Sequence, residues 1–168
     1  MLTKGSDYEQ CFKKNTSWFG LNYIDLAVRV VLGISFGLNE DGYQKWIEAG
    51  IAAHPTLHDE HSKAEIWRFV QRAHFHATGI AAFSLGLILV AGLSSMRAGM
   101  KKLSSGLIGL AGFYPLSWLS IFMLAPSMGP DGAEGALLPK LLVLIGVGGL
   151  LCGLTILALH LLFDMWSE

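Results

Sequence analysis

The sequence predicts an all-α integral membrane protein, built as a bundle of four transmembrane helices. The chain has 168 residues, of which 52% are hydrophobic and only 15% are charged, whereas soluble domains carry about a quarter of their residues as charge. The apolar residues are gathered in four blocks, each close to the roughly 20 residues that cross a hydrocarbon layer. Because these spans take up most of the length, we expect one transmembrane domain over residues 1–168.

The first expected span, residues 18–38, is the least hydrophobic of the four. Asp25 and Arg29 lie four residues apart within it, so they share one helix face and are expected to form an ion pair inside the bundle. A polar outer loop, residues 39–62, follows this span. Apolar side chains recur at helical spacing in the loop, at Tyr43, Trp46, Ile47 and Ile51. The spacing predicts a short helix that lies on the membrane surface.

The second expected span, residues 66–94, belongs to a longer helix. Ser62 and Glu65 match the capping-box pattern, in which each side chain satisfies a backbone donor at the start of a helix. The pattern predicts a helix that begins near Lys63 and runs for about 32 residues, or about 48 Å. Such a helix is longer than the hydrocarbon layer is thick, so its first turns are expected to project from the outer surface.

The third and fourth expected spans cover residues 103–125 and 137–163. Pro115 lies near the middle of the third span, and the N–H that a proline lacks predicts a kink there. The fourth span carries three glycines on one face, and small residues let helices pack closely in a membrane. These are Gly146, Gly149 and Gly153. We therefore expect this face to be a helix-packing seam.

The distribution of Lys and Arg predicts that both termini lie in the cytoplasm. Basic residues precede the first span and separate the second from the third, at Lys4, Lys13, Lys14, Arg97, Lys101 and Lys102. The other two connections are mainly acidic and are expected to face outward, from what we take to be a bacterial inner membrane. Arg68, Arg72 and Lys140 are exceptions on the outer side, and such exceptions often have a specific anionic partner.

The composition argues against several classes of function. A net charge of −1 and a pI near 6.6 leave no basic surface for nucleic acid. Cys11 and Cys152 are far apart and form no CxxC pair for a dithiol or zinc site. No phosphate-binding glycine loop and no Ser–His–acid arrangement stands out. We therefore assign no catalytic residue, and whether the chain is an enzyme stays open.

One face of the second span combines the side chains that a haem site needs. His76 shares this face with Arg72 and Arg68 above it, and with Gly79 and Gly86 below it. An imidazole can bind haem iron, arginines can pair with the propionates, and glycines let the flat macrocycle approach the helix. We therefore expect a haem near the outer end of this span, with His76 as its axial ligand.

The string Arg72-Ala73-His74-Phe75-His76 resembles the Arg-Ala-His-x-His segment that leads into a haem-bearing helix of the haem–copper oxidase family. The resemblance covers a dozen residues at most. Those oxidases have many more spans, so their catalytic chemistry is not carried over. In that motif either histidine can be the ligand, and the resemblance therefore leaves His74 as the alternative to His76. The two imidazoles face different sides of a regular helix, because they are about 200° apart around it.

Three further histidines lie in the outer loop and form an alternative site for copper or zinc. They are His54, His58 and His61. Pro55 interrupts any helix that would align the first two, and loop histidines are commonly only solvated. His160 lies near the opposite end of the fourth span, where it is an alternative ligand for a second haem.

These features lead to three hypotheses. The leading one is a small redox-linked membrane protein that holds haem or a metal near the outer face, as an electron-transfer or accessory subunit of a larger complex. The second is a cofactor-free structural or assembly subunit, whose glycine-lined helices dock against other membrane subunits or further copies of the chain. The third is a transporter or ion-conducting oligomer, for which the third and fourth spans offer few polar groups.

Overall fold

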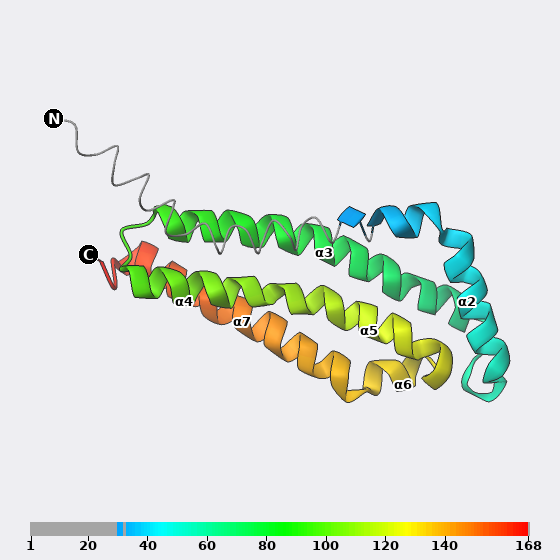
Figure 1. Ribbon diagram of the computed structural model, residues 1–168. Coiled ribbons are helices and arrows are strands. Elements are labelled where there is room, and N and C mark those ends of the chain that lie inside the picture. The colour runs from blue at the N-terminus through cyan, green and yellow to red at the C-terminus, as the bar shows by residue number, and fades with distance from the viewer. Residues whose placement is uncertain (1–29, 32, 168) are drawn as a thin grey trace.

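The computed structural model describes residues 30, 31 and 33–167, and this part of the chain is built from helices (Figure 1). The elements in chain order are α2 (Glu40–Ala53), the 3-10 turn η1 (Pro55–Leu57), α3 (Ser62–Leu93), α4 (Ala98–Gly109), the 3-10 turn η2 (Leu110–Gly112), α5 (Phe113–Met128), α6 (Pro130–Gly135) and α7 (Leu137–Phe163). Residues 33–38 are also helical. The all-α prediction is confirmed for the described residues.

Three helical stretches are long and apolar enough to cross a membrane: Ser62–Leu93, Ala98–Met128 and Leu137–Phe163. They run side by side as long rods in Figure 1. The second, third and fourth expected spans lie within these stretches, except that the second was expected to end one residue later. Residues 18–29 and 32 of the first expected span lie outside the described residues, and so does the expected pair of Asp25 and Arg29.

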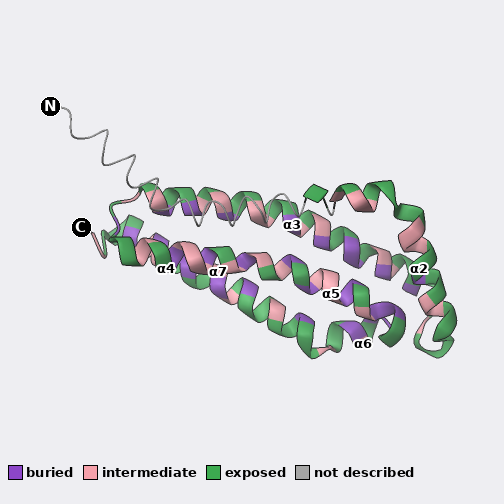
Figure 2. Ribbon diagram, in the orientation of Figure 1, coloured by how far each residue is buried: buried purple, intermediate pink, exposed green. Residues whose placement is uncertain are grey.

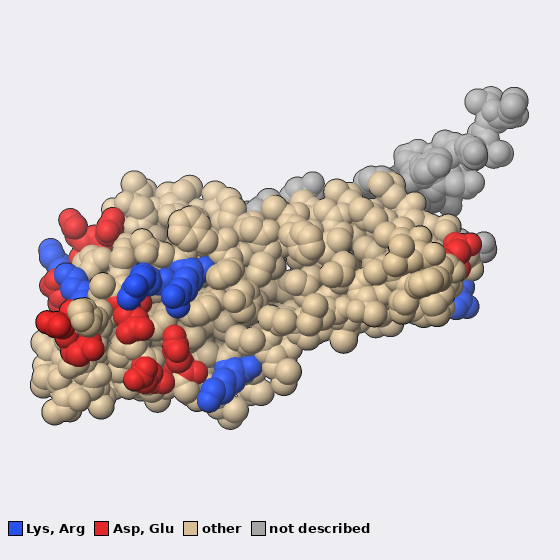
Figure 3. Space-filling view, turned by 180° about the vertical axis from the view of Figure 1, so that it is seen from behind, with Lys and Arg blue, Asp and Glu red and all other residues tan. Residues whose placement is uncertain are grey.

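A charge-free band runs along the three stretches. Residues 73–96, 103–130 and 141–163 contain no Asp, Glu, Lys or Arg. Figure 3 shows the result on one face of the molecule, where charged side chains gather at the two ends and leave the middle uncharged. The outward surfaces of the helices are exposed in Figure 2. They carry large apolar side chains, of which Leu144 on α7 is 69% exposed. An apolar belt of this extent indicates contact with a lipid bilayer.

The stretch Ala98–Met128 is interrupted where the sequence predicts a kink. Pro115 has no N–H to donate to the carbonyl of Ala111, four residues earlier. The chain there forms the 3-10 turn η2 between α4 and α5, immediately before this proline. The loss of one α-helical hydrogen bond therefore divides the stretch into two helices that continue in the same general direction (Figure 1).

The predicted glycine seam of α7 packs directly against backbone. A Cβ at Gly146 would lie 2.6 Å from the Tyr114 nitrogen, and a Cβ at Gly153 would lie 2.8 Å from the Ile108 nitrogen. The buried hydroxyl of Ser104 donates a 2.9 Å hydrogen bond to the Gly153 carbonyl. Close contact and this interhelical bond together join α7 to the stretch Ala98–Met128, so the packing prediction is confirmed.

Helix α2 lies across one end of the bundle and packs its apolar face against it (Figure 1). Ile47 is fully buried, and the rings of Tyr43 and Trp46 lie 6.2 and 5.0 Å from the ring of Phe122 in α5. The core at this end consists of Ile47, Ile66, Phe69, Val70, Ile121, Phe122, Ala125 and Ala133. The predicted helix is present, and the core accounts for its apolar face without a membrane surface.

At the other end, the segment after α7 folds back over the connection between α3 and α4. Asp164 and Trp166 have positive φ values of 53° and 64°, which turn the chain sharply away from the helix axis. The Arg97 N–H donates a 2.8 Å hydrogen bond to the Trp166 carbonyl. Trp166 packs against the cluster that contains the fully buried Met96. The final segment thus closes this end of the helix pair.

Candidate functional site on helix α3

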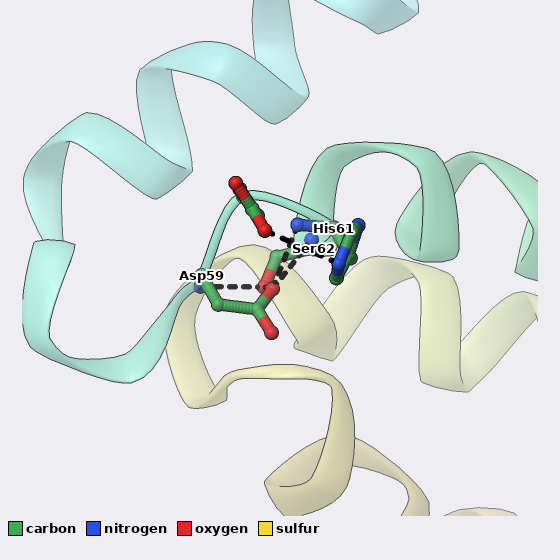
Figure 4. A network of polar contacts seen from close by, with 4 residues as sticks. Asp59, His61 and Ser62 are labelled. Carbon is green, nitrogen blue, oxygen red and sulfur yellow. Dashed lines mark hydrogen bonds and ion pairs between the residues drawn. The ribbon is translucent and has the colours of Figure 1, made fainter.

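The start of α3 is fixed by a reciprocal pair of hydrogen bonds (Figure 4). The Asp59 carboxylate accepts from the Ser62 N–H at 2.8 Å, and the Ser62 hydroxyl oxygen accepts from the Asp59 N–H at 2.9 Å. The same carboxylate accepts from the His61 N–H and the Ser62 hydroxyl. These bonds lower the pKa of Asp59, the Ser62 hydroxyl contributing most. The helix begins where predicted, but its capping pair lies one turn before the predicted Ser62 and Glu65.

His76 faces α5, where it lies among aromatic rings. Its imidazole is 4.9 Å from the Tyr114 ring in an edge-on arrangement and nearly parallel to the Trp118 ring at 6.1 Å. Arg72 extends over the same indole, with its Cζ atom 4.9 Å from the Trp118 centroid. A cation above an indole face is attracted by the ring quadrupole. His76 and Arg72 therefore share Trp118 as a common support.

His74 faces the opposite side of α3 and lines a cavity of about 250 Å³. The cavity wall also contains Gly33, Phe36, Gly37, Glu40, Trp67, Val70, Gln71 and Phe75. A Cβ at Gly33 would lie 2.3 Å from His74 Cε1, so only glycine leaves room for the ring in this position. Trp67 and Gln71 therefore lie on the His74 side of the helix.

The two imidazoles differ from His160 in their hydrogen bonding to the described residues. Among the described residues, no hydrogen-bond donor or acceptor pairs with a ring nitrogen of His74 or His76. Both side chains are half-buried, and they are the second and fourth residues of the charge-free segment that begins at Ala73. A polar group at this depth usually has a partner, because an unpaired one is costly in hydrocarbon.

The other members of the predicted stripe face outward. Arg68, Arg72, Gly79 and Gly86 are all exposed, and a Cβ at either glycine would meet no atom within 4 Å. His76 lies at the edge of this exposed strip and turns its ring toward α5. The structure thus separates His76 from the surface that Gly79 and Gly86 leave open, although all lie on neighbouring positions of one helix.

The three loop histidines engage three different partners. The ring of His54 donates to the Gly50 carbonyl at 3.2 Å, and Nε2 of His58 donates to the Pro126 carbonyl at 3.1 Å. His61 lies 3.4 Å from the Glu60 carboxylate on the exposed surface. No three His, Cys, Asp or Glu side chains in the described part of the chain come together as a metal site. The structure therefore does not bring these histidines into one ligand set.

His160 is buried beneath the segment after α7, and both of its ring nitrogens are used. Nδ1 donates to the Met165 carbonyl, which fixes the tautomer because a carbonyl can only accept. Nε2 then accepts from the Ser95 hydroxyl at 3.3 Å. The imidazole joins the final segment to the α3–α4 connection and has no free nitrogen for the alternative haem.

Two parts of the site were not predicted from the sequence. Tyr114 and Trp118 on α5 surround His76, and their spacing of four residues is a helical signal that was available. Gly33 and Gly37 repeat that spacing beside His74, but the sequence does not say which helix a glycine pair will meet. The acceptor for His58 had a local signal, because Pro130 has no N–H to occupy the Pro126 carbonyl four residues earlier.

Comparison of the chain with protein-family models, with curated proteins and with solved structures gives no match.

Proposed function

We propose that the chain is a small redox-linked membrane protein, which binds haem through a histidine of α3 and acts as an electron-transfer or accessory subunit of a larger membrane complex. The observation that carries the proposal is the pair of half-buried imidazoles, His74 and His76, without hydrogen-bond partners among the described residues. A bound haem would supply one-electron chemistry, while the protein sets its ligand, surroundings and access.

The surroundings favour His74 as the ligand over the His76 expected from the sequence. An axial imidazole needs open volume beside its coordinating nitrogen, and His74 lines a cavity whose wall includes Gly33 and Gly37. His76 instead faces the rings of Tyr114 and Trp118. The resemblance to the haem–copper oxidase segment accommodates either residue.

The cavity fits a haem only in part. Pockets that enclose a whole small ligand usually measure about 300–1,000 Å³, and this one measures about 250 Å³. The donor fits the group, because a free imidazole beside glycines is a suitable ligand. The volume is too small to enclose a haem, so we propose that the group lies partly outside the described residues, against other membrane subunits or a second copy of the chain.

In the membrane, we place the end that carries α2 and α6 outside and the end that carries the α3–α4 connection in the cytoplasm, in a bacterial inner membrane with both termini inside. The basic Arg97, Lys101 and Lys102 lie at the second end and support this orientation. A fourth span over residues 18–38 completes the proposed bundle. His74 then lies just inside the outer boundary.

The proposal is tested by a reduced-minus-oxidised absorption spectrum of the purified full chain, with metal content measured on the same sample. We expect a haem signal in the wild type, its loss in His74→Ala, and its retention in His76→Ala. The reverse pattern would return the ligand to His76. Copper or zinc without haem would move the site to the loop histidines. If the sample contains no haem and no metal, the cofactor-free structural subunit becomes the better interpretation.

A further inference from the structure

Arg68 and Arg72 are cations without an acidic partner among the described residues. They lie four residues apart on one face of α3, and both are exposed. The ion pairs among the described residues join Lys63 to Glu48 and His61 to Glu60, so no described carboxylate lies within 4.0 Å of either arginine. Two neighbouring guanidinium groups repel each other unless an anion lies between them. Their arrangement therefore favours an anionic partner from outside the chain.

The arginines lie where the charge-free band begins. Arg72 is the last charged residue before residues 73–96, so its guanidinium is at the level at which hydrocarbon gives way to lipid headgroups. Trp118 supports it from below, with the Arg72 Cζ atom 4.9 Å from the indole centroid. The planar fork of an arginine matches the oxygens of a phosphate, which it can bind through two parallel hydrogen bonds.

Toward the middle of the charge-free band, the same face of α3 is apolar, and its glycines leave the helix backbone uncovered. Phe75 and Phe83 are 72% and 53% exposed. Gly79 lies between them and Gly86 follows, and a Cβ at either position would meet no atom within 4 Å. The surface between the two rings is therefore at backbone height over more than one helical turn. A hydrocarbon chain can lie against it in van der Waals contact with both rings.

We propose that this face of α3 is a binding site for an anionic phospholipid. Arg68 and Arg72 bind the phosphate of the headgroup, and one acyl chain lies over Gly79 between Phe75 and Phe83. Phe75 also lines the cavity beside His74, but Arg68 and Arg72 do not, so the headgroup contacts do not depend on haem binding there. Arg68 and Arg72 are thereby assigned to a lipid phosphate, whereas the sequence alone assigned them to haem propionates.

The test uses the full chain in phosphatidylcholine nanodiscs or micelles, with phosphatidylglycerol added as the probe and bound lipid counted by native mass spectrometry. Each basic residue near a membrane surface contributes about 1 kcal/mol toward an anionic lipid, so the double variant Arg68→Gln and Arg72→Gln should bind about 20- to 30-fold more weakly. Lys140→Gln removes a charge at the same end on α7 and is the matched control, with little expected effect. Arg72→Lys should retain part of the affinity.

Two further arms separate the lipid from other occupants. Gly79→Leu fills the low surface without a clash and should weaken phosphatidylglycerol binding several-fold, whereas its melting temperature should stay close to that of the wild type. Inorganic phosphate at millimolar concentration should compete poorly, because it lacks the acyl chain. Arg68→Gln alone covers the case in which Arg72 variants unfold, because no hydrogen bond or ion pair joins the Arg68 side chain to another described residue.

Several results would overturn the proposal. One is equal retention of phosphatidylcholine and phosphatidylglycerol by the wild type. Another is unchanged lipid affinity in both the folded Arg68→Gln variant and the double variant. Full competition by inorganic phosphate would show a free-anion site instead. If Gly79→Leu reduces the dimer fraction and leaves lipid retention unchanged, the face belongs to a contact between copies of the chain.

Discussion

Gly33 determines where the His74 imidazole can lie. A Cβ on Gly33 would be 2.3 Å from Cε1 and 2.7 Å from Nδ1 of that ring, closer than real Cβ contacts allow. The colliding atoms are the end of a side chain, so the ring can rotate away while the backbone stays in place. A single methyl group at this position therefore changes the orientation of the His74 ring more than it changes the fold.

We predict that Gly33→Ala alters any haem signal that depends on His74, through a shifted absorption maximum or reduced haem content. The free energy of unfolding should fall by no more than about 1.5 kcal/mol, the usual cost of a displaced rotamer. Gly37→Ala is the control, because a Cβ there would meet no atom within 4 Å. Identical spectra for both variants in haem-loaded protein would exclude His74 as the ligand.

The Asp59 carboxylate links the start of α3 to pH. Hydrogen bonds from the Ser62 hydroxyl and nearby backbone N–H groups lower its pKa below the ordinary value of about 3.9. A carboxylate with a lowered pKa stabilises the folded state above its unfolded pKa, and that contribution is lost as the pH falls through the folded pKa.

We therefore predict that wild type melts at a higher temperature than Asp59→Asn at pH 6, and that the difference shrinks as the pH is lowered below 4. Asparagine can still accept at a helix start, so the comparison isolates the charge. Glu60→Gln removes a neighbouring charge without touching the cap and should show a smaller change with pH. A difference that grows toward low pH would contradict the assignment.

The site was only partly predictable at the level of single residues. Spacing correctly separated His74 from His76, because the angle between two residues on one helix follows from helix geometry. It could not predict that Tyr114 and Trp118 occupy the His76 side, since that depends on which helix packs there. For the same reason it gave His58 no partner, although the Pro126 carbonyl accepts from it across 68 residues of chain.

At the scale of the elements, the seam between α7 and the stretch Ala98–Met128 permits little added volume. A Cβ on Gly153 would lie 2.8 Å from both the Ile108 nitrogen and the Ser104 carbonyl oxygen. These are backbone atoms of a neighbouring helix, so they cannot rotate away as a side chain does. The helices would have to separate, and the Ser104 hydrogen bond to the Gly153 carbonyl would lengthen.

We predict that Gly153→Ala lowers the free energy of unfolding by about 1–3 kcal/mol, the usual cost of overpacking. Gly148→Ala, on the open side of the same helix, should leave stability unchanged or raise it by up to about 1 kcal/mol, because alanine favours helix. Unfolding in micelles by titration with a denaturing detergent measures both variants. Equal stability of the two would mean that the seam is looser than its contacts indicate.

Helix positions were predicted better than helix partners. The ends of α7 match because Leu137 and Phe163 bound an apolar block whose one charged residue is Lys140, and α3 begins at Ser62 because polar capping residues precede it. The apolar face of α2 was equally clear in the sequence, but periodicity says only that such a face must be covered. Tertiary packing on Phe122 and Pro126 decided what covers it.

At the scale of the whole molecule, the two ends of the bundle are chemically distinct. The outer loop and the connection before α7 meet at one end, where His58 donates to Pro126 and a Cβ at Gly129 would lie 2.7 Å from the Leu57 carbonyl oxygen. The segment after α7 and the α3–α4 connection meet at the other. The expectation that the two acidic connections share one end is confirmed.

We predict that single cysteines at Thr56 and Glu134 are labelled by a membrane-impermeant reagent in intact cells, and that one at Lys102 is labelled only after lysis. The background is a chain from which Cys11 and Cys152 have been removed. All three positions lie in the charged end regions, so the substitutions should not disturb the apolar band. Labelling of Lys102 alone in intact cells would reverse the proposed orientation.

The fold-back of the final segment also imposes an order on biogenesis. Ser95 in the α3–α4 connection is synthesised 65 residues before its partner His160. At about 5–20 residues per second, the ribosome needs roughly 3–13 s to cover that distance. During this interval the connection between α3 and α4 lacks its contacts with the final segment, and Met96 lacks the cover of Trp166. Insertion and closure are therefore separate events, and a nascent chain arrested between them would expose this turn to proteases that the finished protein resists.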